Sequence, residues 1–246
     1  MAKYIILDTE TTGAAEHDRV IQLGFLVLGG KEIEVHNEFN SSDVPISTGA
    51  MEVHGITPEL LLGKPSCIET LGYKRLLELN SDENYLIIHN AKFDIEMLQK
   101  EGFVTKMRVI DTLRVAKHLL PDEEAHRLQY FRYKMELYKS EKKEADALGI
   151  EVKAHDAIGD VLVLKLLLSK LKELVQAAYP KENPVEKMVD LTNTPILVTT
   201  LRFGKHKGKA FTDVAKEDAP YLRWMLGNME NLDEDMRYSI NYYLGN

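Results

Sequence analysis

Two acids separated by one residue, Asp8 and Glu10, stand at the end of an apolar run that begins at Lys3. The run predicts a β-strand, and residues two apart in a strand project from the same face. Two carboxylates a few ångströms apart repel each other by roughly 3 kcal/mol at an effective dielectric of about 20. A shared proton or a bound cation should offset that repulsion. A strand that ends in solvated acids is the simpler alternative, and the rest of the chain decides between the two.

Two further acids stand near the starts of predicted helices. Asp94 follows a short apolar strand predicted over 85–88 and precedes a helix predicted over 95–101. A carboxylate in the first turn of a helix interacts favourably with the helix dipole, so Asp94 also has a purely structural explanation. Asp160 lies in a strongly apolar helix predicted over 157–174, where an acid needs a partner or a metal.

The acidic segments occur in an order that matches a known pattern. Asp-x-Glu-Thr-Thr-Gly from Asp8, His-Asn-Ala-x-Phe-Asp from His89 and His-Asp-Ala-x-x-Asp-Val from His155 together resemble the DEDDh family of 3′→5′ exonucleases. This family includes the proofreading epsilon subunit of bacterial DNA polymerase III. The resemblance covers about residues 1–176 and implies an α/β, ribonuclease H-like fold, in which helices flank a mixed sheet.

The resemblance also implies a role for each catalytic position. Four acids are implied to hold two divalent cations, Mg²⁺ or Mn²⁺: Asp8, Glu10, Asp94 and Asp160. Hard oxygen ligands suit these ions, and a pair of ions can neutralise charge at a phosphodiester. His155 is implied to be the general base, because a histidine can take up a proton near neutral pH. Asp156 is expected only to cap the following helix.

Contacts with the 3′-terminal nucleotide are implied as well. Thr11 lies where a backbone amide and a side chain hold the 3′-hydroxyl, and His54 and Ile56 occupy the segment that packs on the terminal base or sugar. Asn90 and Phe93 flank the third acid and are expected to shape the same pocket. Burial in the core explains Ile56 and Phe93 equally well.

The remaining sequence must supply the elements that position these residues. Thr57 and Pro58 predict the start of a helix, and residues 127–147 predict one long charged helix whose purpose the sequence does not reveal. Further elements are predicted as strands over 19–28, 32–40 and 109–112 and as helices over 68–79 and 113–120. An antiparallel meander followed by alternating helices and strands indicates the α/β class.

Prolines and charges over 179–194 predict a linker between an exonuclease domain, residues 1–178, and a small α+β module, residues 195–246. Within that module a strand is predicted over 196–203. Two helices are predicted after it, over 219–229 and 233–244.

A basic loop follows the strand predicted in the module. Its four cations lie within eight residues that contain no acid: Arg202, Lys205, Lys207 and Lys209. Such a concentration is a candidate phosphate contact, although lysines at a solvated hairpin tip can also protect a sheet edge. The wording of residues 203–214 and 218–225 resembles the C-terminal module of exodeoxyribonuclease X-like enzymes. Tyr221 and Trp224 share a helical face and are expected in the core rather than as base-stacking platforms.

The composition is that of an ordinary globular protein. The chain has 246 residues, of which 44% are hydrophobic and 28% charged. Its single cysteine excludes a disulfide framework and a cysteine-based zinc site and fits a reducing cytosol. We expect no signal peptide and no membrane span, and therefore a cytoplasmic location. The net charge of −8 argues against indiscriminate coating of nucleic acid.

The sequence therefore predicts a metal-dependent 3′→5′ exonuclease that releases 5′-mononucleotides from single-stranded or frayed 3′ ends of DNA, with repair or replication as its setting by analogy. A related enzyme acting on RNA stays open, because the shared site recognises a 3′ end and a phosphate. A non-catalytic, polymerase-associated nucleic-acid-binding subunit is the alternative from another class. The intact acids and histidine argue against it. Oligomeric state is not predicted.

Overall fold

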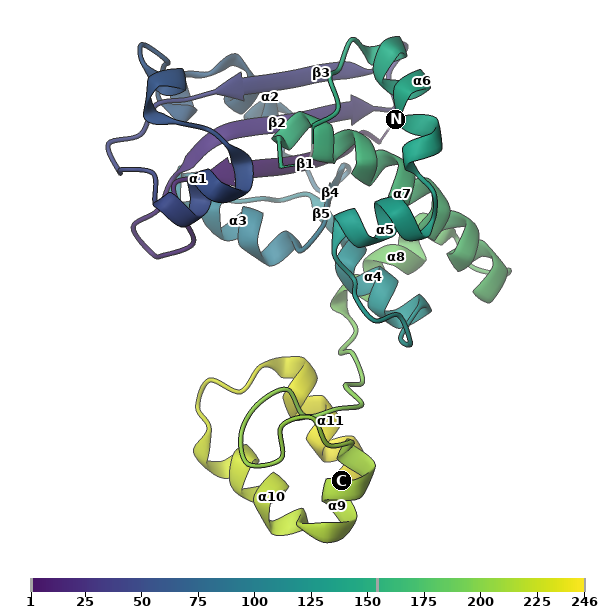
Figure 1. Ribbon diagram of the computed structural model, residues 1–246. Helices are drawn as coiled ribbons and strands as arrows, with labels where there is room; N and C mark the ends of the chain where they lie inside the picture. Colours follow the sequence, from purple (N-terminus) through teal and green to yellow (C-terminus); the bar gives the residue numbers. More distant parts are fainter. Residues whose placement is uncertain (1, 154, 246) are drawn as a thin grey trace. The chain divides into compact units, whose positions relative to one another are not determined.

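Within the described residues, 2–153 and 155–245, five strands form one mixed sheet in the order β3-β2-β1-β4-β5 (Figure 1). The strands of this computed structural model are β1 (Tyr4–Thr11), β2 (Val20–Leu28), β3 (Glu34–Phe39), β4 (Tyr85–Ile88) and β5 (Arg108–Asp111). Strands β1 to β3 form an antiparallel meander, and β4 and β5 run parallel to β1. The predicted sheet and meander are confirmed. The chain divides into two compact units, residues 1–192 and 193–246, and the sheet belongs to the first.

Eight α-helices are described in the first unit, and several start at the caps that the sequence offers. Asp156 and Asp111 each accept hydrogen bonds from backbone amides of the helix that follows. The helices are α1 (Thr48–His54), α2 (Leu71–Leu79), α3 (Ala91–Lys100), α4 (Thr112–Leu119), α5 (Leu128–Lys134), α6 (Tyr138–Leu148), α7 (Ala157–Ala178) and α8 (Pro184–Asn193). The helix α1, which Ser47 caps, was not predicted from the sequence. Thr57 and Pro58 open only a short 3₁₀ helix, Pro58–Leu61.

The two faces of the sheet bury different cores. Ile6 packs with α7 on one face, whereas Ile5 and Leu7 pack with α2 and α3 on the other. Cys67 is buried in the second core. Side chains alternate along a strand, so Asp8 and Glu10 continue the face of Ile6. The acids therefore emerge beneath the first turns of α7, the longest helix described.

The charged helix predicted over 127–147 is not continuous. It breaks into α5 and α6 at residues 135–137, where Glu136 has a φ of 54°. The break allows Phe131 of α5 and Leu137 of the turn both to enter the core beside α7. Burial of two large apolar side chains outweighs the helix propensity of the charged residues between them.

The predicted linker is also wrong in its larger part. Residues 184–193 form α8, whose Met188 and Leu191 are buried in the core that α7 shares with the sheet. Glu186 of the same helix pairs with Arg108 of β5. The boundary between units falls after this helix, because α8 contributes apolar surface that only the first unit can bury.

The second unit has its own core, built by α9 (Phe211–Glu217), α10 (Ala219–Asn228) and α11 (Glu234–Leu244). The strand predicted over 196–203 does not form; only an isolated bridge joins Thr200 to Ala210. Side chains of α11 take the backbone donors that a neighbouring strand would have taken. The amide of Ile196 donates to Asp235 and that of Val198 to Ser239. The described part of the unit is therefore helical rather than α+β.

Across the residues that the structure describes, we find no helix whose length and apolar character would let it span a bilayer.

Candidate active site

Asp8 and Glu10 lie at the carboxyl end of β1, on the face that α7 covers. Asp8 is opposite Gly24 of β2. A Cβ on Gly24 would lie 2.8 Å from backbone atoms of Ala157 and Ile158, the first two residues of α7. Only glycine lets the helix approach the strand this closely, and the approach brings the first turn of α7 next to the two acids.

Asp94 is fixed to β1 by Thr9. Its Oδ1 atom accepts hydrogen bonds from the backbone amide of Thr9 at 3.0 Å and from the hydroxyl of Thr9 at 2.8 Å. The residue is only 3% exposed. Asp94 therefore reaches the end of β1 from the first turn of α3, with its Oδ1 atom held by two hydrogen bonds from Thr9.

A buried polar relay holds Asp160. Its Oδ1 accepts a hydrogen bond from Gln129 of α5 at 2.6 Å, and its Oδ2 accepts one from the backbone amide of His155 at 3.3 Å. Arg132 donates to the side-chain oxygen of Gln129 at 3.2 Å and forms a two-point pair with Glu141 of α6 at 2.6 Å. The Arg132–Glu141 pair thus joins α5 to α6 across their break and orients the amide that contacts Asp160.

His155 stands exposed in the turn before α7, with a φ of 56° that non-glycine residues seldom adopt. Its imidazole makes no hydrogen bond with the described residues. Gln22 of β2 holds the next two positions: its amide donates to Asp156 at 2.8 Å, and its oxygen accepts from the amide of Ala157 at 3.3 Å. The histidine is therefore free to act while the backbone that follows it is fixed.

Burial and mutual repulsion raise the pKa values of the four acids, so that simultaneous ionisation of all four is unfavourable. Burial, followed by the charges of the other acids, raises the pKa of Glu10 to about 8 and raises that of Asp8 well above its usual range. Burial likewise raises the pKa of Asp94 to about 7 and that of Asp160 to about 6. Asp8 feels Asp94 and Asp160 more strongly than it feels Glu10. All four carboxylates therefore share one electrostatic field.

The chemistry of this donor set fits hard divalent cations, which prefer carboxylate oxygens. No lysine or arginine of the described residues forms an ion pair with any of the four acids. Even so, no three acidic, histidine or cysteine side chains among those residues are gathered closely enough to form a ready metal cage. To bind an ion, the four carboxylates would have to move closer together. Their mutual repulsion disfavours that arrangement when no cation is bound.

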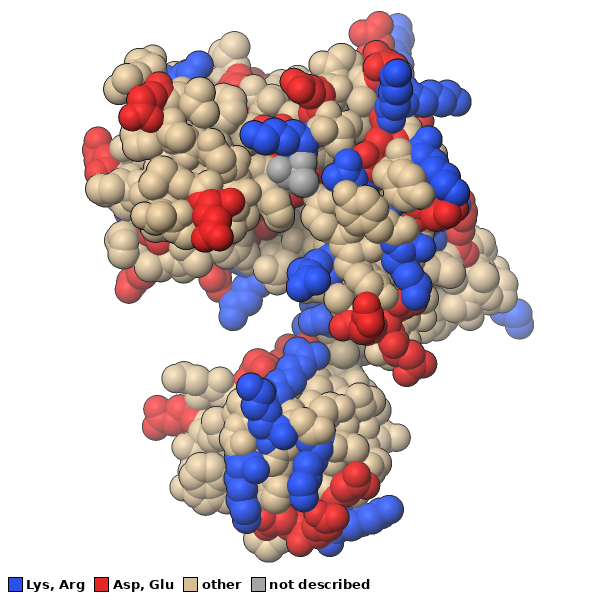
Figure 2. Space-filling view, viewed as in Figure 1, with Lys and Arg blue, Asp and Glu red and all other residues tan. Residues whose placement is uncertain are grey.

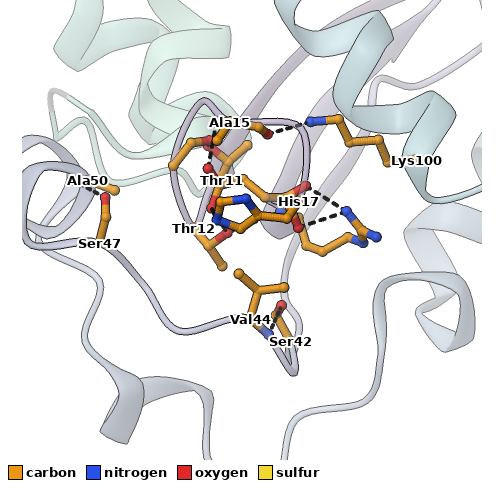
Figure 3. A network of polar contacts seen from close by, with 12 residues as sticks. Thr11, Thr12, Ala15, His17, Ser42, Val44, Ser47, Ala50 and Lys100 are labelled. Carbon is orange, nitrogen blue, oxygen red and sulfur yellow. Dashed lines mark hydrogen bonds and ion pairs between the residues drawn. The ribbon is translucent and has the colours of Figure 1, made fainter.

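A pocket of about 420 Å³ opens beside Glu10. Its walls come from β1 and the turn after it, from α1 and from α3: Thr9, Glu10, Thr11, Gly13, Ala14, Ser47, Gly49, Ala50, Val53, His54 and Phe93. Figure 3 shows how the turn is fixed, with Lys100 of α3 donating to the carbonyl of Ala15 at 2.8 Å. The hydroxyl of Thr11 donates to the carbonyl of Gly13 at 2.7 Å. These two hydrogen bonds hold the turn whose Gly13 and Ala14 form part of the pocket wall.

The five predicted substrate contacts divide between the pocket and other places. Thr11, His54 and Phe93 line the pocket. Ile56 does not, because it is buried in a small core with Ile21 and Leu61. Asn90 is exposed at the start of α3, and its backbone amide donates to Asp111. Ile56 and Asn90 therefore do not line the pocket.

His54 is buried and held at both ring nitrogens. Its Nδ1 accepts from the amide of Ile56 at 2.9 Å, so Nε2 carries the proton and donates to the carbonyl of Thr11 at 3.2 Å. Burial lowers the pKa of His54. A neutral His54 therefore fixes the backbone of Thr11. Val53, which the sequence did not reveal as a site residue, is 56% exposed at the same pocket and is a large apolar side chain that α1 offers to a ligand.

The basic loop of the second unit is partly neutralised. Lys205 pairs with Asp218 at 2.8 Å, and Lys209 pairs with Glu217 at 3.1 Å. Arg202 and Lys207 are exposed and make no ion pair with a described residue. Figure 2 shows lysine and arginine side chains spread over one face of this unit. Two of the four predicted phosphate contacts are thus already engaged by acids of the same unit.

Comparisons with known proteins agree with these two units. A family model described as "Exonuclease" matches residues 5–168, and one described as "Exodeoxyribonuclease X-like C-terminal" matches residues 201–230. Exodeoxyribonuclease 10 of Escherichia coli (strain K12) is 29% identical over 243 residues, which cover 98% of both chains. A PolC-type DNA polymerase III of Bacillus cereus is 32% identical over 184 residues, covering 72% of this chain and 12% of that protein.

Solved structures resemble the fold. Exonuclease X in complex with 5′ overhanging duplex DNA has a TM-score of 0.53 at 22% identity, covering 78% of this chain and 99% of that one. An Escherichia coli exonuclease I complex with single-stranded DNA has a TM-score of 0.54 at 20% identity, covering 76% of this chain and 42% of that one. At these identities the likeness concerns the fold alone.

Proposed function

Because this chain belongs to the exonuclease family, we propose that it is a metal-dependent 3′→5′ exonuclease that hydrolyses phosphodiester bonds at DNA 3′ ends and releases 5′-mononucleotides. One observation carries the proposal. Four carboxylates from three elements share one field beside a pocket, and no described lysine or arginine pairs with them. A site built this way is costly to the fold unless it binds cations. The choice of DNA is supported by the relative named exodeoxyribonuclease 10, and DNA repair or replication is the proposed setting.

In this proposal the acids of β1, α3 and α7 hold two divalent cations, Mg²⁺ or Mn²⁺. Bound cations would supply positive charge at the phosphate and activate water as a nucleophile. Asp94 and Asp160 each arrive already oriented, by Thr9 and by Gln129. No described residue donates a hydrogen bond to the carboxylates of Asp8 and Glu10, which are therefore the ligands that must reorient.

His155 is the proposed general base. Its exposed ring can take the proton of the attacking water, while its backbone amide is tied to Asp160 and the turn after it to Gln22. The hydrogen bond from the backbone amide of His155 to Asp160 fixes the distance between the backbone of the proposed base and this proposed metal ligand. The ring alone moves, which is what proton uptake and release require.

The pocket beside Glu10 is the proposed seat of the 3′-terminal nucleotide. Its volume lies in the range of small-ligand pockets. Phe93 and Val53 provide apolar contact for a base or sugar, and the backbone of Thr11 is held by His54 for contact with the 3′-hydroxyl. A terminal nucleotide seated here would place its phosphate toward the four acids.

The basic loop of the second unit is proposed to contact the nucleic-acid backbone. Arg202 and Lys207 are the loop cations without an acidic partner among the described residues. They are therefore the members of the predicted set that can meet phosphates without first giving up an ion pair.

The test is digestion of 3′-labelled and 5′-labelled oligonucleotides with Mg²⁺ or Mn²⁺. Single-stranded DNA, duplex DNA and RNA of one sequence are compared. We expect 5′-mononucleotides to appear first from the 3′ end of DNA and expect EDTA or Asp8→Ala to abolish their release. Activity that survives Asp8→Ala, or release from the 5′ end, would contradict the proposal. Faster digestion of RNA than of DNA would replace DNA by RNA as the substrate.

A further inference from the structure

Trp224 is exposed, contrary to the prediction that it belongs to a core. It is the only tryptophan of the chain and is 53% exposed on α10. The core of the second unit is filled instead by its neighbours Leu222 and Met225. A large aromatic ring in solvent contributes less to stability than a buried one, and a small unit has few other apolar side chains to bury. The ring is therefore available for contact with a ligand.

The exposed ring is fixed in place and joined to the basic loop. Tyr221 stacks on Trp224 with ring centroids 6.0 Å apart and an interplanar angle of 22°. The hydroxyl of Tyr221 accepts a hydrogen bond from the amide of Lys205 at 3.1 Å. Gly204 makes this contact possible, because a Cβ there would lie 2.1 Å from the same hydroxyl. Trp224, Tyr221 and the start of the basic loop therefore form one continuous surface.

The carboxylate of Asp218 provides a second contact between the basic loop and α10. Asp218 caps α10 by accepting from the amide of Tyr221, and it also accepts from Lys205 and His206 at 2.8 Å. Lys205 and His206 lower the pKa of Asp218 to about 2. The loop is thus held to the helix by charge as well as by the tyrosine.

Unpaired cations accompany this surface. Lys207 in the loop and Arg223, the residue before Trp224, are exposed, and neither pairs with an acid among the described residues. Lysine and arginine without acidic partners can neutralise phosphates. Lys207 follows Lys205, whose amide is bonded to Tyr221, by two residues, and Arg223 precedes Trp224 on α10. An aromatic ring with such cations close by in the chain matches the chemistry of a strand with unpaired bases and a charged backbone.

We propose that the surface formed by Trp224, Tyr221, Lys207 and Arg223 is a binding site for single-stranded DNA, in which an unpaired base stacks on Trp224 and the two cations contact phosphates. The exposed ring is stacked on Tyr221 and Arg223, next to it in the chain, is exposed, a combination of aromatic face and positive charge that favours a nucleobase and its phosphate over an apolar protein surface. This site does not depend on the acids of the first unit and binds in the absence of metal.

The single tryptophan allows a direct test. The full-length protein in EDTA is titrated with an oligothymidylate of about 12 nucleotides while tryptophan emission and the anisotropy of a labelled copy are followed. We expect binding to quench the emission, because the only tryptophan is at the proposed contact. A blunt duplex, whose bases are already paired, should not quench it. Saturated anisotropy with unchanged emission, or no binding at all, would overturn the proposal.

Variants separate stacking from general attraction. Trp224→Ala should weaken binding by roughly 5- to 100-fold, and Trp224→Phe should recover most of it. Lys207→Ala with Arg223→Ala should flatten the dependence of affinity on salt. The matched control is Tyr242→Ala, which removes another exposed ring, 57% exposed, from α11 and should leave affinity unchanged. Equal losses in Trp224→Ala and Tyr242→Ala would count against a specific site.

This outcome is separable from that of the proposed exonuclease activity. Asp8→Ala should abolish hydrolysis and leave the quenching of Trp224 intact. Quenching without hydrolysis in the wild-type protein would sink the catalytic proposal alone, and hydrolysis without quenching would sink the stacking site alone.

Discussion

At the scale of single residues, the four acids differ in how firmly the fold holds them. Asp94 and Asp160 are buried and accept hydrogen bonds from side chains, whereas Asp8 and Glu10 are half-buried and accept none from the described residues. Two acids are thus oriented in advance and two can adjust. This division reduces the number of ligands that must be ordered when cations bind.

The raised pKa values predict how stability depends on pH. Unfolded carboxyl groups titrate near pH 4, whereas in the fold burial raises the pKa of Asp160 to about 6 and that of Glu10 to about 8. The folded state therefore binds more protons than the unfolded chain between these limits, so metal-free stability falls as pH rises from about 4 to about 8. We expect Mn²⁺ to raise the melting temperature more at pH 8 than at pH 5.5.

Asp8→Asn provides the matched variant for that measurement. It removes one of the repelling charges, so in EDTA at pH 8 it should melt above the wild-type protein although it cannot hydrolyse DNA. A melting temperature below that of the wild type, or an equal gain from Mn²⁺ at both pH values, would contradict the electrostatic explanation.

Gln129→Leu tests the relay behind Asp160. The substitution removes the amide that donates to Asp160 and keeps a similar volume, so we expect a roughly 10- to 100-fold loss of kcat or of Mn²⁺ affinity. Calorimetric titration of Mn²⁺ and single-turnover hydrolysis measure the two. Gln99→Leu makes the same change at an exposed position of α3 and should alter neither. Activity unchanged in Gln129→Leu would show that Asp160 needs no such support.

The acids and the histidine could be predicted from the sequence because their chemistry is local to short motifs. Gln22 and Gln129 could not be predicted, because their partners lie 134 and 31 residues away. A glutamine has no preferred role that its neighbours in sequence reveal; only the fold brings its amide to a carboxylate. The core alternative held open for Ile56 is the one that the structure shows, and Trp224 was wrongly expected in a core, since a side chain of either type suits both core and surface.

At the scale of elements, the contact between β2 and α7 determines where Asp160 lies. Gly24→Ala would place a methyl group against the backbone of Ala157 and Ile158, which cannot yield as a flexible side chain would. We expect a loss of about 1–3 kcal/mol in unfolding free energy and a larger proportional loss of activity, because the first turn of α7 moves away from β1. Urea unfolding and hydrolysis rates measure both.

Gly227→Ala is the control for this helix approach. A Cβ at Gly227 meets no atom within 4 Å, so alanine there should leave activity unchanged and stabilise α10 by up to about 1 kcal/mol. If Gly24→Ala were as active as Gly227→Ala, the close approach of α7 would not matter for the site.

The same scale explains which elements the sequence could predict. Strands with continuous apolar runs, such as β1 and β4, were found because burial on both faces leaves a plain signal. The break between α5 and α6 was not predicted, because the sequence of this charged segment is typical of one continuous helix. Nothing in it indicates that Arg132 and Glu141 form an ion pair across the break. The strand expected over 196–203 is wrong, because α11 side chains take the amides of Ile196 and Val198.

At the scale of the whole molecule, two units with separate cores should tolerate separation at the right residue. A chain ending at residue 193 keeps α8 and should retain metal-dependent hydrolysis of short oligonucleotides. A chain ending at residue 178, the boundary predicted from sequence, loses Met188 and Leu191 from the core. We expect that loss to cost roughly 3–6 kcal/mol, seen as a lower melting temperature than that of the longer fragment. Equal melting temperatures would argue that α8 is dispensable.

The burial of the single cysteine thiol determines how the protein can be labelled with thiol-reactive probes. Cys67 is the single cysteine of the chain, and burial raises the pKa of its thiol to about 12. Maleimides and iodoacetamides react with an exposed thiolate, which Cys67 does not offer at neutral pH. A cysteine placed on the surface, for example Lys92→Cys on α3, should therefore take up one fluorophore or spin label per chain, and the native sequence needs no cysteine replacement beforehand.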